Sequence, residues 1–178
     1  MDWYEKLKNY FPDEELKHPG QFEELLQKSP AYHKFETPEV IVMYADFPTF
    51  LFIDYFLVTS KERGRGVGSK VLNAFKKRGK PIILEVEPAD DDDPDTVRRV
   101  HFYEKNGFRK AEHIVYTRRD DDGEEFSMDV WYWHEAFISE REVLSNMAVI
   151  CREIHNFKAQ KYYGRLIATP DEVLDWDS

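Results

Sequence analysis

The chain has 178 residues, a length typical of one domain with a modest extension and sufficient to enclose a hydrophobic core without disulfides. Hydrophobic residues make up 42% and aromatic residues 15%, which excludes a disordered acidic tail despite a net charge of −10. That charge argues against nucleic acid as a partner, because phosphate binding is driven by cationic side chains, and the single cysteine excludes an internal disulfide and a cysteine-rich metal site.

The N-terminal half is predicted to begin with helices and to continue as strands. Apolar residues recur at helical spacing in two segments, 2–10 and 20–28. Runs of β-branched and aromatic residues then predict three strands, at 33–36, 40–44 and 50–58. The most apolar window, 39–58, contains charged residues and a proline, and no apolar leader precedes it. We therefore expect a cytoplasmic protein that does not associate with membranes.

The second half alternates helices and strands. A helix over 67–78 and a short apolar strand over 81–87 precede a helix over 96–106, which Asn106-Gly107 is predicted to cap. Two further strands, near 112–118 and 125–134, are joined by a turn at Asp120-Asp121-Asp122-Gly123. This order predicts one mixed α/β domain over residues 1–135.

The last segment, 136–178, is predicted to be a helical extension that packs on or extends that domain. Ser139 and Glu142 match a helix capping box, and an apolar stripe runs along the following helix to Phe157, after which we expect a polar tail. We favour a stripe that covers the chain's own sheet. The alternative is a stripe that forms a homodimer or partner interface.

Residues 63–70, Arg-Gly-Arg-Gly-Val-Gly-Ser-Lys, lie between a predicted strand and a predicted helix. Three close glycines let backbone N–H groups converge beside a helix N-terminus, which suits a pyrophosphate; the alternative is a loop that only needs tight turns. Segment 61–80 has eight basic residues and one acid, a charge of +7, so the rest of the chain carries −17. The spacing matches neither a Walker ATP loop nor the dinucleotide G-x-G-x-x-G loop.

Two motifs together resemble a known family. Residues 58–68, Val-Thr-Ser-Lys-Glu-Arg-Gly-Arg-Gly-Val-Gly, are similar to the R/Q-x-x-G-x-G/A signature of the GNAT superfamily of N-acetyltransferases. Residues 100–108, Val-His-Phe-Tyr-Glu-Lys-Asn-Gly-Phe, resemble its second landmark, a helix ending in Tyr-Glu-Lys-x-Gly-Phe. The resemblance covers about residues 20–134 and implies the GNAT fold and acyl-CoA-dependent N-acetyl transfer.

The resemblance implies that acetyl-CoA, with no metal, lies in a cleft where two parallel strands splay apart. The pantetheine arm is expected along the strand that carries Phe56 and Val58, with the backbone N–H near Val58 polarising the thioester carbonyl. The pyrophosphate is expected on the glycine loop, formed by Arg63, Gly64, Arg65, Gly66, Val67, Gly68 and Ser69. One departure is that residues 93–97 hold no asparagine where many relatives use one to contact the cofactor.

Tyr103 matches the family tyrosine that protonates the departing CoA thiolate, a role open to a phenol of pKa ~10. The alternative is an aromatic residue that only packs on its helix. A base must also take a proton from the amine, and strand residues Asp54, Glu85 and Glu87 are the candidates, with Asp54 and Glu87 ranked slightly ahead. The period of two predicts that Asp54 shares a strand face with Phe52, Phe56 and Val58. The alternative is that one or more of these carboxylates only points to solvent or caps the sheet end.

The leading hypothesis is an N-acetyltransferase acting on a small cationic amine or a basic peptide. The first two helices are expected to shape the acceptor pocket, and the acidic loop 90–95 to attract a cation if it lies at the cleft mouth. The alternative is a catalytically weak CoA-binding regulatory or interaction module, against which the intact Tyr103 argues.

Overall fold

The computed structural model describes residues 2–59 and 64–178. In this part of the chain one open sheet has the strand order β1-β2-β3-β4-β7-β6-β8, with β5 paired to β7. Its strands are β1 (Tyr32–Glu36), β2 (Val40–Asp46), β3 (Leu51–Val58), β4 (Ile82–Val86), β5 (Arg109–Lys110), β6 (Ile114–Arg119), β7 (Glu125–Trp133) and β8 (Leu174–Trp176). Neighbours pair antiparallel except β3 and β4, which are parallel.

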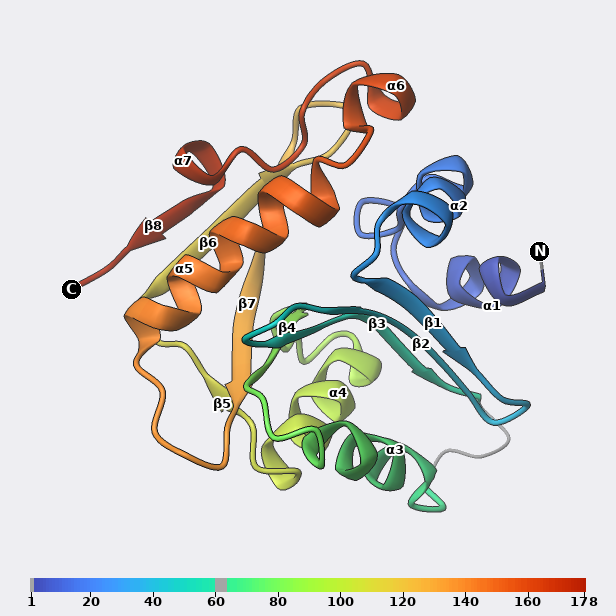
Figure 1. Ribbon diagram of the computed structural model, residues 1–178, viewed down its shortest axis with the longest axis vertical. Coiled ribbons are helices and arrows are strands. Elements are labelled where there is room, and N and C mark those ends of the chain that lie inside the picture. Colours follow the sequence, from blue (N-terminus) through green and yellow to red (C-terminus); the bar gives the residue numbers. More distant parts are fainter. Residues whose placement is uncertain (1, 60–63) are drawn as a thin grey trace.

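Helices cover both faces of this sheet, as Figure 1 shows. The helices are α1 (Asp2–Tyr10), α2 (Pro19–Lys28), α3 (Val67–Lys76), α4 (Pro94–Lys105), α5 (Glu140–Ile150), α6 (Ala159–Tyr163) and α7 (Pro170–Val173). Apolar residues of α3 and α4 pack on one face, and those of α1, α2 and α5 form the larger core on the other. None of the helices in the described ranges is long and apolar enough to cross a membrane.

The mixed α/β fold predicted from the sequence is confirmed, with most element boundaries within a few residues. The predicted end of α4 is also confirmed, because Gly107 adopts the positive φ of 86° that a helix-terminating glycine provides. The turn between β6 and β7 closes through a 3.1 Å hydrogen bond from the Gly123 N–H to the Asp120 carbonyl. At the start of α5, the Ser139 side chain accepts from the Glu142 N–H, as a capping residue does.

The segment after α5, which the sequence analysis described only as a polar tail, has regular secondary structure. The chain forms α6, α7 and β8, and β8 adds an edge strand to the sheet by pairing with β6. The Trp176 ring stacks on His113, and the Arg141 guanidinium lies 3.8 Å from the Trp176 ring centre. Contacts with residues far along the chain therefore order a segment whose own composition is polar.

The apolar stripe of α5 covers the chain's own sheet, as the preferred interpretation predicted. Val143, Met147 and Ile150 are fully buried in the larger core, so the alternative, a dimer interface built on this stripe, is wrong. The helix continues into one π-helical turn, Cys151–His155, which closes with a 2.9 Å hydrogen bond from the Asn156 N–H to the Cys151 carbonyl. This turn buries His155 beneath the sheet face.

Candidate active site

A large groove opens where the two parallel strands separate. β3 and β4 pair only from Leu51↔Ile82 to Ile53↔Leu84, whereas β3 runs on to Val58. A cavity of about 590 Å³ lies beside the stretch of β3 that does not pair with β4. Its walls are β3, the glycine loop with the start of α3, and α4. The cleft between splayed strands that the resemblance implies is therefore present.

The glycine loop has the backbone geometry that its sequence predicts. Gly64 and Gly66 have φ values of 82° and 80°, a region that residues with a Cβ rarely enter. Gly66 is followed at once by α3, so the N-terminal N–H groups of this helix face the groove. Gly68 permits a close approach, since a Cβ there would lie 2.8 Å from the ring of Phe102 on α4.

Most of the predicted cofactor residues line this groove. They are Phe56, Val58, Gly64, Gly66, Val67, Gly68 and Ser69. Arg65 is exposed and does not line it, and Arg63 lies outside the described residues. The α4 wall adds basic side chains that the sequence analysis did not single out, Arg98, His101 and Lys105. His101 and Lys105 belong to the motif quoted for this helix, but the sequence analysis assigned a role only to its tyrosine.

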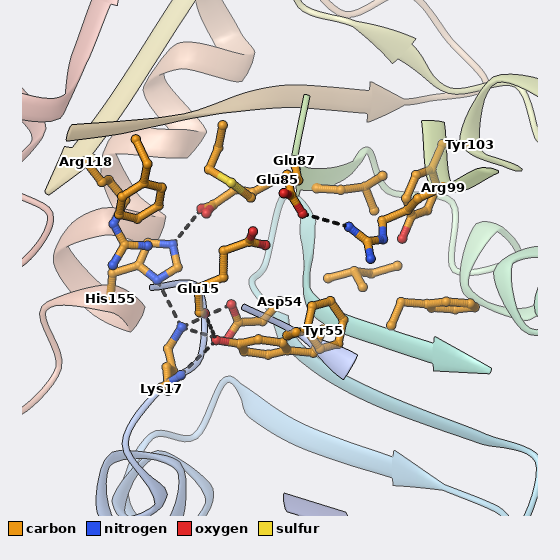
Figure 2. A pocket seen from close by; sticks show the side chains of 16 residues that line it. Glu15, Lys17, Asp54, Tyr55, Glu85, Glu87, Arg99, Tyr103, Arg118 and His155 are labelled. Carbon is orange, nitrogen blue, oxygen red and sulfur yellow. Dashed lines mark hydrogen bonds and ion pairs between the residues drawn. The ribbon is translucent and has the colours of Figure 1, made fainter. Parts of the chain in front are cut away.

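A small pocket of about 40 Å³ adjoins the groove, and Figure 2 shows its charged lining. It brings together all four residues predicted to act in catalysis: Tyr103, Asp54, Glu85 and Glu87. Phe56, Arg99 and Tyr103 line both cavities, so the two spaces meet at the tyrosine. The segment between α1 and α2 contributes Glu15 and Lys17, as expected if the N-terminal helices shape this pocket.

Asp54 does not share a strand face with Phe56 and Val58, so that prediction was wrong. The register of β2 and β3 shifts between Met43 and Tyr44, which pair with Tyr55 and Ile53, so Asp54 is the extra residue of a β-bulge. The bulge resets the alternation along β3. Asp54 consequently turns to the face of the larger core, where its partners lie.

Asp54 is part of a buried network of charged side chains. Its carboxylate lies 2.8 Å from the Lys17 ammonium and accepts a 2.6 Å hydrogen bond from the Tyr32 hydroxyl. Both members of the ion pair are buried, with side chains 5% and 4% exposed. Lys17 also donates to Nδ1 of His155 at 3.0 Å. Asp54 is thus fully engaged by neighbours.

His155 carries the network on to Glu85. Its Nε2 lies 2.6 Å from Glu85 Oε2, and the Tyr116 hydroxyl donates to Glu85 Oε1 at 3.2 Å. Because an ammonium can only donate, the contact with Lys17 makes Nδ1 the acceptor and Nε2–H the donor of a neutral ring. Burial, together with Lys17, lowers the pKa of His155, in agreement with that neutral state.

The carboxyl groups of the pocket differ in their electrostatic environments. Burial opposes the ionisation of Glu85, but His155, Arg118 and Lys17 outweigh it and hold the pKa of Glu85 below its ordinary value. Glu87 lies 3.5 Å from the Arg99 guanidinium. Burial, and then the negative charge of Glu87, raise the pKa of Glu15 to about 8. Glu15 and Glu85 therefore titrate in different pH ranges.

Tyr103 lies at the junction of the two cavities, nearly buried and packed edge-on against Phe108. Burial raises the pKa of Tyr103 above its usual value, although the Arg99 guanidinium opposes this. The phenol thus stays protonated across the physiological range. The acidic loop, in contrast, does not reach the small pocket: Asp93 caps α4 and Asp95 lines the large groove.

Sequence reasoning missed several lining residues of the small pocket. Lys17 and Glu15 lie in a connecting segment without a recognisable pattern, and Arg118 stands near the end of a strand. Only His155 could have been noticed in the sequence, because it is a polar residue that directly follows Ile154, one of the last residues of the predicted apolar stripe. These side chains become neighbours only through the tertiary fold.

Comparisons with known proteins agree with this geometry. A family model described as "Acetyltransferase (GNAT) domain" matches residues 33–110. The protein named "Putative acetyltransferase YjbC" of Bacillus subtilis (strain 168) is 44% identical over 177 residues, which cover 98% of this chain and 92% of that protein.

Solved structures show the same fold. One titled "Putative acetyltransferase from GNAT family from Bacteroides thetaiotaomicron" has 22% identity, a TM-score of 0.69 and 92% coverage of both chains. NAA60 of Arabidopsis thaliana in complex with acetyl-CoA has 11% identity and a TM-score of 0.56, over 75% of this chain and 92% of that one. With 44% identity along nearly its whole length to the protein named "Putative acetyltransferase YjbC", a matching family model and the GNAT fold, the chain belongs to the GNAT superfamily and is an acyl-CoA-dependent N-acetyltransferase.

Proposed function

We propose that this chain moves the acetyl group of acetyl-CoA onto a primary amine, with acetyl-CoA in the large groove and the amine in the small pocket. The observation that carries the proposal is the meeting of the two cavities at Tyr103. A thioester that reaches this junction from the groove can be attacked by an amine from the other side. Direct attack needs only that both reactants are held in contact there.

The groove suits the parts of acetyl-CoA. The N–H groups of the glycine loop and the N-terminus of α3 would hold the pyrophosphate. Across the groove, Lys105 of α4 offers positive charge and the His101 ring offers a hydrogen-bond donor to further phosphate oxygens. The pantetheine arm would follow β3 past Phe56 and Val58, where β4 no longer pairs with this strand. The structure of NAA60 with acetyl-CoA supports this assignment at the level of the fold.

In this proposal Tyr103 protonates the departing thiolate. The phenol is buried, so it loses its proton only to a strong base formed beside it. The CoA thiolate becomes such a base as the carbon–sulfur bond breaks, because the same dry surroundings disfavour its charge. The junction of the two cavities would place the sulfur next to the phenol.

The small pocket suits a cationic acceptor. Its lining holds four carboxyl groups and three cationic side chains, those of Lys17, Arg99 and Arg118, and the aromatic rings of Phe11 and Phe126 complete the wall. Aromatic walls suit the methylene stem of an alkylamine, and carboxylates suit its ammonium group. We therefore propose a small cationic amine or a lysine side chain of a basic peptide as the acceptor.

Two measurements test the proposal. Calorimetric titration should show saturable acetyl-CoA binding, and its absence would discard the assignment of the groove. A screen of amines, followed by the release of free CoA thiol, should then find turnover with alkylamines that are cationic at neutral pH. Tight acetyl-CoA binding with no thiol release for any amine would favour the alternative, a catalytically weak CoA-binding regulatory module.

A further inference from the structure

We propose that Glu15 is the base that takes the proton from the acceptor's ammonium group, in place of the strand carboxylates Asp54, Glu85 and Glu87. This inference rests on the proposed function, because it concerns the amine that reacts there. It assigns a catalytic role to the segment between α1 and α2, which lies outside the residues matched by the family model.

Glu15 has the right position. In Figure 2 its side chain points into the middle of the pocket, between the network around His155 and the Arg99 side chain. It also lines an adjoining pocket of about 50 Å³, whose other walls include Asp13 and Arg165. Glu15 therefore faces both the site of the reacting amine and a second space on the side away from the large groove.

The backbone of this segment is fixed by Tyr55 of β3. The Tyr55 hydroxyl accepts a 3.0 Å hydrogen bond from the Lys17 N–H and donates to the carbonyl of Glu15. Tyr55 itself is buried. Tyr55 thus fixes the backbone at Glu15 and leaves its carboxylate directed into the pocket.

Each of the three strand carboxylates already has an ion-pair or hydrogen-bond partner within the protein. Asp54 is paired with Lys17, Glu85 accepts from His155 and Tyr116, and Glu87 lies within 3.5 Å of Arg99. Taking up a proton would cost each of them part of these interactions. Among the residues that the structure describes, no cation lies within 4.0 Å of the Glu15 carboxylate, so protonation of Glu15 breaks no ion pair.

The electrostatic surroundings match Glu15 to this task. Burial and the nearby Glu87 raise its pKa to about 8, closer to that of an alkylammonium than an ordinary carboxyl, while Arg99 limits the rise. The titratable and charged groups that face it across the two pockets are Asp13, Glu14, Lys17, Asp54, Tyr55, Glu85, Glu87, Arg99, Tyr103, Arg118, Arg119, Asp120, Asp121, His155, Tyr163 and Arg165.

The proton balance is complete. The ammonium transfers one proton to the Glu15 carboxylate, and the neutral amine then attacks the thioester carbonyl to form the carbon–nitrogen bond. As the carbon–sulfur bond breaks, Tyr103 gives its proton to the thiolate and recovers one from the nitrogen. The proton on Glu15 leaves to solvent through the adjoining pocket. The products are the acetamide, CoA thiol and one released proton.

The test compares Glu15→Gln with Glu23→Gln, a matched change at an exposed position of α2 that lines neither pocket. Two acceptors are used, an alkylamine cationic at pH 7 and hydroxylamine, which is neutral there. For the alkylamine we expect Glu15→Gln to lower kcat/KM about 10²-fold or more and to remove its rise with pH through about 8. With hydroxylamine the loss should shrink to less than about tenfold, because no ammonium proton needs to be removed. Acetyl-CoA affinity should stay unchanged.

Equal losses with both acceptors, or a wild-type pH profile in Glu15→Gln, would overturn the assignment to Glu15 while leaving acetyl transfer itself intact. Glu15→Asp provides a second variant, which should restore the rising limb of the pH profile with reduced turnover. NMR titration of the Glu15 carboxyl in the unmodified chain needs no acceptor, and a pKa near the ordinary glutamate value of about 4.3 would refute the proposal. Failure of the proposed function is recognised separately, as the absence of acetyl-CoA binding or of any amine turnover in the unmodified chain.

Discussion

Replacing Lys17 by methionine should destabilise the fold strongly, because it leaves a buried charge without its counter-ion. The Lys17 ammonium contacts both oxygens of Asp54, at 2.8 and 3.1 Å, and Nδ1 of His155 at 3.0 Å. Methionine keeps nearly the length of the side chain but supplies none of these donors. Asp54 would keep only the Tyr32 hydroxyl. Removing one partner of a buried pair typically costs about 3–5 kcal/mol, a large fraction of the stability of a domain.

A double-mutant cycle separates the ion pair from the other effects of the change. The amide introduced by Asp54→Asn can still accept from Tyr32 but carries no charge, so Lys17→Met combined with Asp54→Asn should cost less than the sum of the single variants. Coupling energies between residues in one network run from about 0.5 to 3 kcal/mol, and we expect the upper part of this range. Urea unfolding at pH 7 of the four proteins, with equal m-values, gives each free energy of unfolding.

The cycle also decides what Asp54 does. If Asp54 were a base that spends part of its time unpaired, Lys17→Met would cost less than about 1 kcal/mol and the two changes would be additive. That result would refute the reasoning that the network is a structural ion pair. It would return Asp54 to the list of catalytic candidates.

Two further predictions concern the groove and its junction with the pocket. Tyr103→Phe removes the phenolic proton but keeps the ring that packs on Phe108, so turnover should fall about 10²-fold or more with acetyl-CoA affinity nearly intact. Unchanged turnover at saturating substrate would remove Tyr103 from the mechanism. Gly68→Val places side-chain carbons where a Cβ alone would already lie 2.8 Å from the Phe102 ring, which should push α3 away from α4 and weaken acetyl-CoA binding about tenfold or more in a calorimetric titration. The control is Asn73→Ala on the exposed side of α3, and equal affinity of the two variants would show that the close approach at Gly68 does not shape the groove.

The large groove could be predicted from the sequence because its determinants are local. Gly64 and Gly66 must adopt positive φ within one turn, and α3 must begin immediately after them. Because these requirements fall on consecutive residues, they produce a recognisable sequence motif. The same holds for Gly107, which ends α4 a few residues after Tyr103. The groove is therefore formed by elements whose backbone conformation is determined by their local sequence.

The face of Asp54 could not be predicted by the same means. A period of two assumes a regular strand, and one inserted residue reverses the faces of everything beyond it. The bulge depends on how β3 pairs with Met43 and Tyr44 of β2, and nothing in β3 alone marks it. Pairing with a distant partner also explains β8, where a polar segment becomes a strand because β6 offers an open edge.

The two sides of the site differ in where their residues lie along the chain, and this has a functional consequence. Most residues of the groove, from Phe56 to Lys105, lie within the region that the family model matches. Several side chains of the small pocket come from outside it, with Lys17 and His155 in direct contact although 138 positions separate them. A protein can therefore change its N- and C-terminal segments, and with them the shape and charge of the acceptor pocket, without disturbing the cofactor groove.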